Sequence, residues 1–259
     1  TPSKFSAKIY RVALCTSNPM ADNMPLDWVS AGCEDVYNSA NGEETGNIFS
    51  KTGATLSASN VSIPKEGEYS YIAALFDKSF KAGSHHMVYQ AGVIPETPIN
   101  SKRYYSEENG NAQEGSAADV QMMDGSFNTF MPQMDCTGGW SSSAPQVQKT
   151  DATMTQAGFG GFLDAGETFF GRVLDSNYEI ASINGGDMST STAFCADGMY
   201  LLSIVDKAIT INETTSGIHI KILAPKGLVR ADQGNGNGQV LTFSTHGESV
   251  AVKVIPLSE

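Results

Sequence analysis

Histidine and serine are the side chains that most often carry hydrolytic chemistry, and this chain of 259 residues has only four histidines. His85 and His86 are adjacent, so on a strand their rings point to opposite faces and cannot both bind one metal ion. His219 alternates with isoleucines, which places it on the solvent side of a strand, and His246 precedes a glycine in a predicted turn. A surface position therefore accounts for all four histidines.

A nucleophilic serine or a catalytic pair of carboxylates would need a more specific pattern than this chain contains. No Gly-x-Ser-x-Gly sequence is present, and Gly139-Trp140-Ser141 does not replace it. Glycoside hydrolysis needs two carboxylates across a cleft, and candidates lie in the middle of the chain: Asp119, Asp124, Asp135, Asp164 and Glu167. Asp164 and Glu167 flank Ala-Gly, which first indicates a turn. The sequence predicts that the protein is not an enzyme.

Oxygen-rich loops make calcium the metal to consider. Residues 232–237 and 119–128 offer carboxylate and carbonyl oxygens, but neither stretch fits the EF-hand loop with its closing glutamate. Ordinary turns account for both stretches. We expect no cofactor, keep calcium as the open alternative, and assign no metal ligand.

The four cysteines predict disulfides. Cys15, Cys33, Cys136 and Cys195 form no Cys-x-x-Cys pair, and no histidine lies near them at ligand spacing. We favour pairing Cys15 with Cys33 and Cys136 with Cys195, because the first pair closes a short polar loop; four buried thiols are the alternative. Disulfides indicate an oxidising compartment, so we expect a secreted, extracellular or cell-surface protein.

Charge and hydropathy argue against two classes of partner. The formal net charge is −12 and the 16 basic residues are scattered singly, so nucleic acid is not an expected partner. No apolar run approaches the roughly 18 residues of a membrane-spanning helix, so no membrane span is expected. We also expect Thr1 to be the residue left by removal of a secretion leader, which the intact mass of the native protein tests.

Short alternating segments rich in β-branched and aromatic residues predict an all-β fold. Strands are expected over 4–15, 69–80, 167–183, 199–211, 217–223, 239–245 and 249–255, with a shorter strand within 26–37. The stretch from Ile209 to Ile222 predicts a hairpin, and only 112–123 could form helical turns. The pattern indicates one antiparallel β-sandwich domain over 1–259, Greek-key and jelly-roll-like, with a loop-rich insertion at about 95–165.

A local motif adds a family resemblance. The opening strand, followed by Ile63-Pro64-Lys65-Glu66-Gly67-Glu68-Tyr69 before another strand, resembles the Pro-x-Gly-x-Tyr turn of secreted prealbumin-like and Cna-B-like β-sandwich surface proteins. The resemblance implies an adhesive or structural role at a surface, and it implies no catalytic residue.

The opening strand suggests how such a protein is used. Phe5, Ala7 and Ile9 share one face, whereas residues 10–15 are apolar on both faces. We expect residues 10–15 to belong to the protein's own core, and we expect the side chains of Phe5, Ala7 and Ile9 to contact a neighbouring subunit. The main hypothesis is an extracellular structural subunit of a self-assembling, pilus-like filament or surface layer, in which copies of the chain add this donor strand to one another's sheets.

The alternative hypothesis is a secreted carbohydrate-binding or adhesive module, or a viral structural protein. Trp140, with Phe127 and Phe130, could form an exposed aromatic platform on which a sugar stacks. Two N-glycosylation sequons, Asn60-Val61-Ser62 and Asn212-Glu213-Thr214, matter only in a host that glycosylates.

Overall fold

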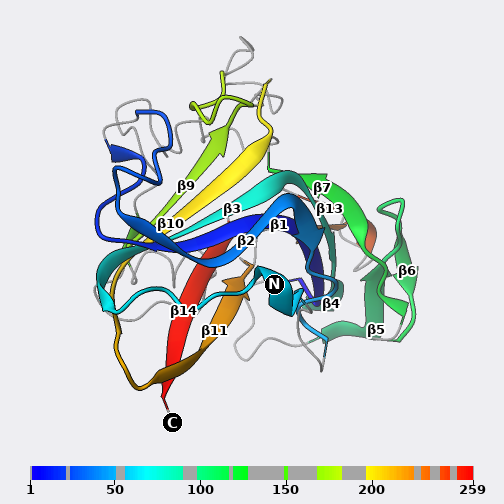
Figure 1. The fold of residues 1–259 in the computed structure, drawn as a ribbon. Helices are drawn as coiled ribbons and strands as arrows, with labels where there is room; N and C mark the ends of the chain where they lie inside the picture. The colour runs from blue at the N-terminus through cyan, green and yellow to red at the C-terminus, as the bar shows by residue number, and fades with distance from the viewer. Residues whose placement is uncertain are drawn as a thin grey trace.

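The computed structural model describes residues 2–21, 24–50, 56–89, 98–116, 119–127, 149–150, 168–182, 197–224, 229–233, 240–245 and 250–258. Apart from short 3₁₀ turns, of which Ala58–Asn60 is described over its full length, the elements of these residues are strands (Figure 1). The strands form antiparallel sheets, which confirms the prediction of an all-β, sandwich-like fold.

The largest sheet has the strand order β2-β1-β3-β10-β9-β8, and β7 pairs with the far end of β3. Its strands are β1 (Lys4–Cys15), β2 (Cys33–Glu44), β3 (Gly67–Gly83), β7 (Met123–Ser126), β8 (Lys149–Thr150), β9 (Thr168–Leu174) and β10 (Tyr200–Ile211). The long strands β1, β3 and β10 are rich in apolar residues at both alternating positions, which suits strands at the centre of a sheet.

A second layer is formed by β11 (Thr215–Leu223) and β14 (Ala251–Ser258), which pair with each other. β14 contacts β10 and β3 of the main sheet, and Figure 1 shows β11 and β14 crossing that sheet as a separate pair. Val252 and Val254 from this layer belong to the same buried cluster as Phe5, Ile9 and Val12. The larger buried cluster therefore lies between the two layers, and a second cluster, which includes Ala13, Ala73 and Leu75, is formed by the alternate positions of the same strands.

Two smaller sheets stand beside the end of β3. One contains β4 (His85–Tyr89), β5 (Pro98–Ser106) and β6 (Ala112–Glu114), and the other contains β12 (Val229–Gln233) and β13 (Val240–Thr245). β13 contacts β5, β6 and β7, so these strands close one end of the main sheet.

The structure corrects five local predictions. β10 and β11 do not form a hairpin, because β10 pairs with β3 and β9 while β11 pairs with β14. Residues 28–32 turn, and the strand expected within 26–37 begins only at Cys33. Residues 98–106, expected as loop, form β5, and the strand expected over 167–183 ends at Leu174, before a turn at 176–177. Within 112–123, where helical turns were expected, residues 112–114 form β6 and Met123 begins β7, while Asp119 lies in a 3₁₀ turn.

One of these corrections has a tertiary cause and another has a local one. Ile209 and Ile211 face the core from one layer and the isoleucines of β11 face it from the other, so the turn between them changes sheets. In the 28–32 turn, the Asp27 carboxylate accepts hydrogen bonds from the N–H groups of Val29 and Ser30, 3.0 Å each, and this bends the chain.

Candidate functional site: the first strand and its slot

β1 lies inside the main sheet, paired with β2 along one edge and with β3 along the other. Phe5, Ala7 and Ile9 have exposed fractions of 0%, 1% and 0%. The prediction that these side chains stand free for a neighbouring subunit is therefore wrong for the single chain, because they fill its own core. An alternating strand pattern selects a buried face but does not say whose core that face fills.

The pairing of β1 divides the strand into two halves. Its register with β3 shifts between Ala7 and Ile9 and again between Ile9 and Arg11, and its register with β2 shifts between Ile9 and Arg11 and again between Val12 and Ala13. Three of these four shifts lie between Ala7 and Arg11, where the apolar pattern of the sequence changes. We call Lys4–Ile9 the entry segment and Arg11–Cys15 the anchored segment.

The entry segment occupies a slot with β3 on one side, whereas on the other side Phe5 and Ala7 contact the loop 45–48 and Lys8 and Ile9 pair with the end of β2. On the β3 side, Phe5 pairs with Ala82 and Ala7 pairs with Phe80. On the other side, the loop 45–48 supplies the partners: Thr45 donates its N–H to the Ala7 carbonyl at 2.9 Å and accepts the Ala7 N–H on its hydroxyl at 3.1 Å. The backbone of Ala7 is thus satisfied without a neighbouring strand on that side.

The same loop also holds Phe5. The Phe5 N–H donates to the Asn47 side-chain oxygen at 3.2 Å, and the Ile48 N–H donates to the Phe5 carbonyl at 2.9 Å. Together with the bonds to Thr45, these contacts line the slot with groups that recognise any extended segment through its backbone.

The floor of the slot is aromatic. The Phe5 ring lies 5.8 Å from the Phe80 ring, measured between centroids, and Phe80 lies 4.6 Å from Phe127. Phe127 is fully buried, so its predicted part in an exposed sugar-binding platform is wrong. The other two members of that platform, Trp140 and Phe130, lie outside the described residues.

The anchored segment is tied to β2 by covalent and ionic contacts. The predicted disulfide between Cys15 and Cys33 is present, with an S–S distance of 2.02 Å. Arg11 Nε lies 2.5 Å from an Asp35 carboxylate oxygen, and the Arg11 guanidinium lies 4.3 Å from the centre of the Trp28 ring. Cys136 and Cys195 lie outside the described residues, so the second pairing stays a prediction.

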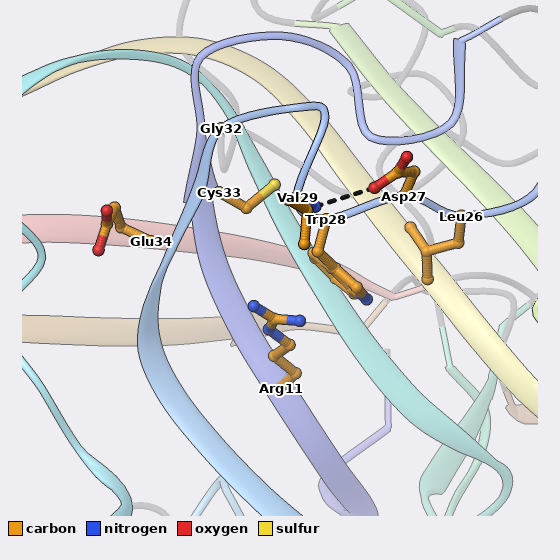
Figure 2. A pocket seen from close by; sticks show the side chains of 8 residues that line it. All are labelled: Arg11, Leu26, Asp27, Trp28, Val29, Gly32, Cys33 and Glu34. Atoms are coloured by element: carbon orange, nitrogen blue, oxygen red, sulfur yellow. Dashed lines mark hydrogen bonds between the residues drawn. The ribbon is translucent and has the colours of Figure 1, made fainter.

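A pocket of about 460 Å³ opens beside this disulfide. Figure 2 shows its lining: Arg11, Leu26, Asp27, Trp28, Val29, Gly32, Cys33 and Glu34. The sequence did not predict this pocket. The feature of the sequence that could have indicated it is the group of apolar residues Leu26, Trp28 and Val29 in an otherwise polar loop.

The charged groups of the pocket are already paired within the chain. Arg11 is paired with Asp35, and Glu34 accepts a 2.6 Å bond from Lys65. Hydrogen bonds from Ser30, first from its side chain, lower the pKa of Asp27. Because these charged groups are engaged, the pocket is better suited to hold an apolar group against the exposed side chain of Val29 than to carry out acid–base chemistry.

The remaining candidate residues form no reactive cluster in the described part of the chain. His219 is exposed on β11, as predicted, and the His85 ring lies 6.0 Å from the Tyr105 ring. Within the described ranges, no three His, Cys, Asp or Glu side chains are arranged to hold a metal ion. The Asp119 carboxylate accepts bonds from the Ser116 N–H and hydroxyl, at 2.6 and 2.9 Å, so in the 119–128 loop it caps a turn.

Comparisons with known proteins do not place the chain in a family. No protein-family model matches it, and no curated protein or solved structure is significantly similar to it. Across the residues that the structure describes, no helix is both long and apolar enough to cross a membrane.

Proposed function

We propose that this chain is an extracellular structural subunit whose copies assemble into a filament or surface layer by exchanging the entry segment. In the assembly, residues Lys4–Ile9 of one copy occupy the slot of the next copy, between β3 on one side and the loop 45–48 with the end of β2 on the other. The observation that carries the proposal is the division of β1, which separates a buried segment held by noncovalent contacts from one held by a disulfide.

The burial of Phe5, Ala7 and Ile9 fits this proposal, because an exchanged segment makes the same contacts between copies that it makes within one copy. Fully burying an apolar side chain such as Phe or Ile contributes about 1.5–3 kcal/mol, and an exchanged copy recovers that contribution. The balance between closed monomers and assemblies then depends on concentration and on strain in the connecting residues.

The anchored segment sets a limit to the exchange. Cys15 is bonded to Cys33, and the Arg11 side chain contacts Asp35 and Trp28, so residues from Arg11 onward stay in their own sheet. The entry segment is joined directly to the anchored segment, so it can reach only a copy that lies next to its own. When each copy inserts its entry segment into the next and the series does not close into a ring, the result is a filament. The disulfide also supports an extracellular location.

The test uses Ser6 and Lys81, which lie opposite each other across β1 and β3. Directly opposed residues in an antiparallel pair have Cβ atoms roughly 4.5–5.5 Å apart, close to the range of a disulfide. Two single variants, Ser6→Cys and Lys81→Cys, are mixed, unfolded without reductant, refolded together at high concentration and oxidised. A cross-link between them forms only when the entry segment of one copy lies in the slot of another.

We expect a disulfide-linked heterodimer on a non-reducing gel and filaments of the unmodified protein by negative-stain electron microscopy. The matched control is Ser6→Cys mixed with Glu68→Cys, since Glu68 is at the other end of β3, where it pairs with Thr210. A heterodimer yield equal to that of the control, with only monomers in the micrographs, would refute the exchange and favour a self-contained binding module.

A further inference from the structure

We infer that Asn212 is an N-linked glycan attachment site of this protein and that Asn60, which also lies in a sequon, is not. The inference is independent of assembly and applies where the producing cell's secretory route carries an oligosaccharyl transferase. It rests on the different surroundings of two asparagines that share the sequence pattern Asn-x-Ser/Thr.

Asn212 lies in the turn that links β10 to β11, and all three residues of its sequon are exposed. Its side-chain oxygen accepts hydrogen bonds from the Thr214 N–H at 3.0 Å and from the Thr214 hydroxyl at 2.8 Å. These bonds fix the amide by its oxygen, which leaves the Nδ2 group on the solvent side. Among the described residues no hydrogen bond from Asn212 Nδ2 is formed.

Asn60 is placed differently. It is half-buried at the end of the 3₁₀ helix, and its Nδ2 donates to a Glu43 carboxylate oxygen at 3.3 Å. The hydroxyl of its sequon, on Ser62, donates to the Asp35 carbonyl at 2.6 Å and so lies against β2. A glycan on Asn60 would break the bond to Glu43 and crowd the segment that runs along the edge of β2.

The modification is an ordinary substitution with no change of oxidation state. The Asn212 Nδ2 atom forms a bond to C1 of the first sugar of a lipid-linked oligosaccharide. The bond between that C1 and the diphosphate oxygen breaks, the lipid diphosphate leaves, and the amide loses one proton. A glycan on this turn projects from the surface, where such groups are accommodated, and lies far in sequence from the entry segment and its slot.

The experiment expresses the full chain through the secretory route of a cultured eukaryotic cell and maps its glycopeptides by mass spectrometry after enzymatic release. We expect one occupied site, at Asn212. The Asn212→Gln and Thr214→Ala variants should each lose the whole glycan mass, and the Asn60→Gln and Ser62→Ala variants should keep it. Because the two Asn212-sequon variants remove different parts of the site, agreement between them separates loss of the acceptor from misfolding.

Two outcomes would overturn the inference: a glycan found on Asn60 to the same extent as on Asn212, or a secreted chain that carries no glycan at Asn212.

Discussion

The ring of Phe5 packs against the ring of Phe80 with 5.8 Å between centroids, and this contact fixes the entry segment to β3 at the base of the slot. Phe5 has no exposed surface. Replacing a buried Phe by Ala removes its burial and leaves a cavity, which together cost about 3–5 kcal/mol. We expect Phe5→Ala to lower the free energy of unfolding by that amount in urea denaturation.

The control for this prediction is Val29→Ala, since Val29 is 89% exposed. A surface change of this kind should stay within about 0.5 kcal/mol of the parent protein. If Phe5→Ala behaved like Val29→Ala, the entry segment would contribute little to the fold and the slot would not be a binding element.

The slot should accept the entry segment when it is supplied as a separate peptide. A chain beginning at Tyr10 keeps the anchored segment and its disulfide but leaves the slot open. We expect a fluorescent peptide with the sequence of residues 2–9 to bind this chain in a 1:1 ratio by fluorescence anisotropy and to raise its melting temperature. The matched peptide carrying Phe5→Asp should not bind, because it would bury a charge against Phe80. Equal binding of both peptides would contradict the proposed recognition.

Stability should depend on the ionisation of Glu43. Hydrogen bonds lower the pKa of this carboxyl, first from the Ser57 side chain and then from Tyr37, whose hydroxyl lies 2.9 Å from Oε2. A pKa lowered by folding gives a contribution that is present above the unfolded-state pKa of about 4.3 and is lost as the pH falls through the folded-state pKa.

Glu43→Gln removes this titration and keeps a similar shape. The difference in unfolding free energy between the parent protein and Glu43→Gln should therefore be largest near neutral pH and shrink as the pH falls below about 4.3. Urea denaturation at a series of pH values measures it, and a difference that does not change with pH would contradict this role of Glu43.

The disulfide should stabilise the fold by restricting the unfolded chain. Cys15 and Cys33 are separated by 18 positions, and a loop of about this size corresponds to roughly 3 kcal/mol. We expect the double variant Cys15→Ser, Cys33→Ser to lose about that much stability by urea denaturation. Without the disulfide, the anchored segment should also be able to exchange between copies. Ala13 pairs with Ala73, so cross-links between an Ala13→Cys copy and an Ala73→Cys copy should appear only when both copies also carry Cys15→Ser and Cys33→Ser. Their appearance in the parent background would show that the anchored segment is not anchored by the disulfide.

Much of the fold could be predicted because strand patterns are local. The alternation of residues predicted strands over 4–15 and 217–223, and the structure has them at Lys4–Cys15 and Thr215–Leu223, since side chains of a strand point to alternate faces. The pairing of Cys15 with Cys33 followed from their short separation. The partner of each strand was harder to predict from the sequence. Ile209 and Ile218 are close in sequence and residues typical of a turn lie between them, yet they belong to different layers.

The candidate site shows the same division. The sequence alone determined that Phe5, Ala7 and Ile9 form one apolar face and that the character of the strand changes after Ile9, because both properties follow from residue type and the two-residue period. Only the tertiary structure decided that the backbone of this segment lies between β3 and the loop 45–48 of the same chain, and that its apolar face joins the buried cluster that includes Phe127. The physical reason is that backbone hydrogen bonds and apolar burial are alike for every strand edge, so the choice of partner depends on which edges the folded chain brings together.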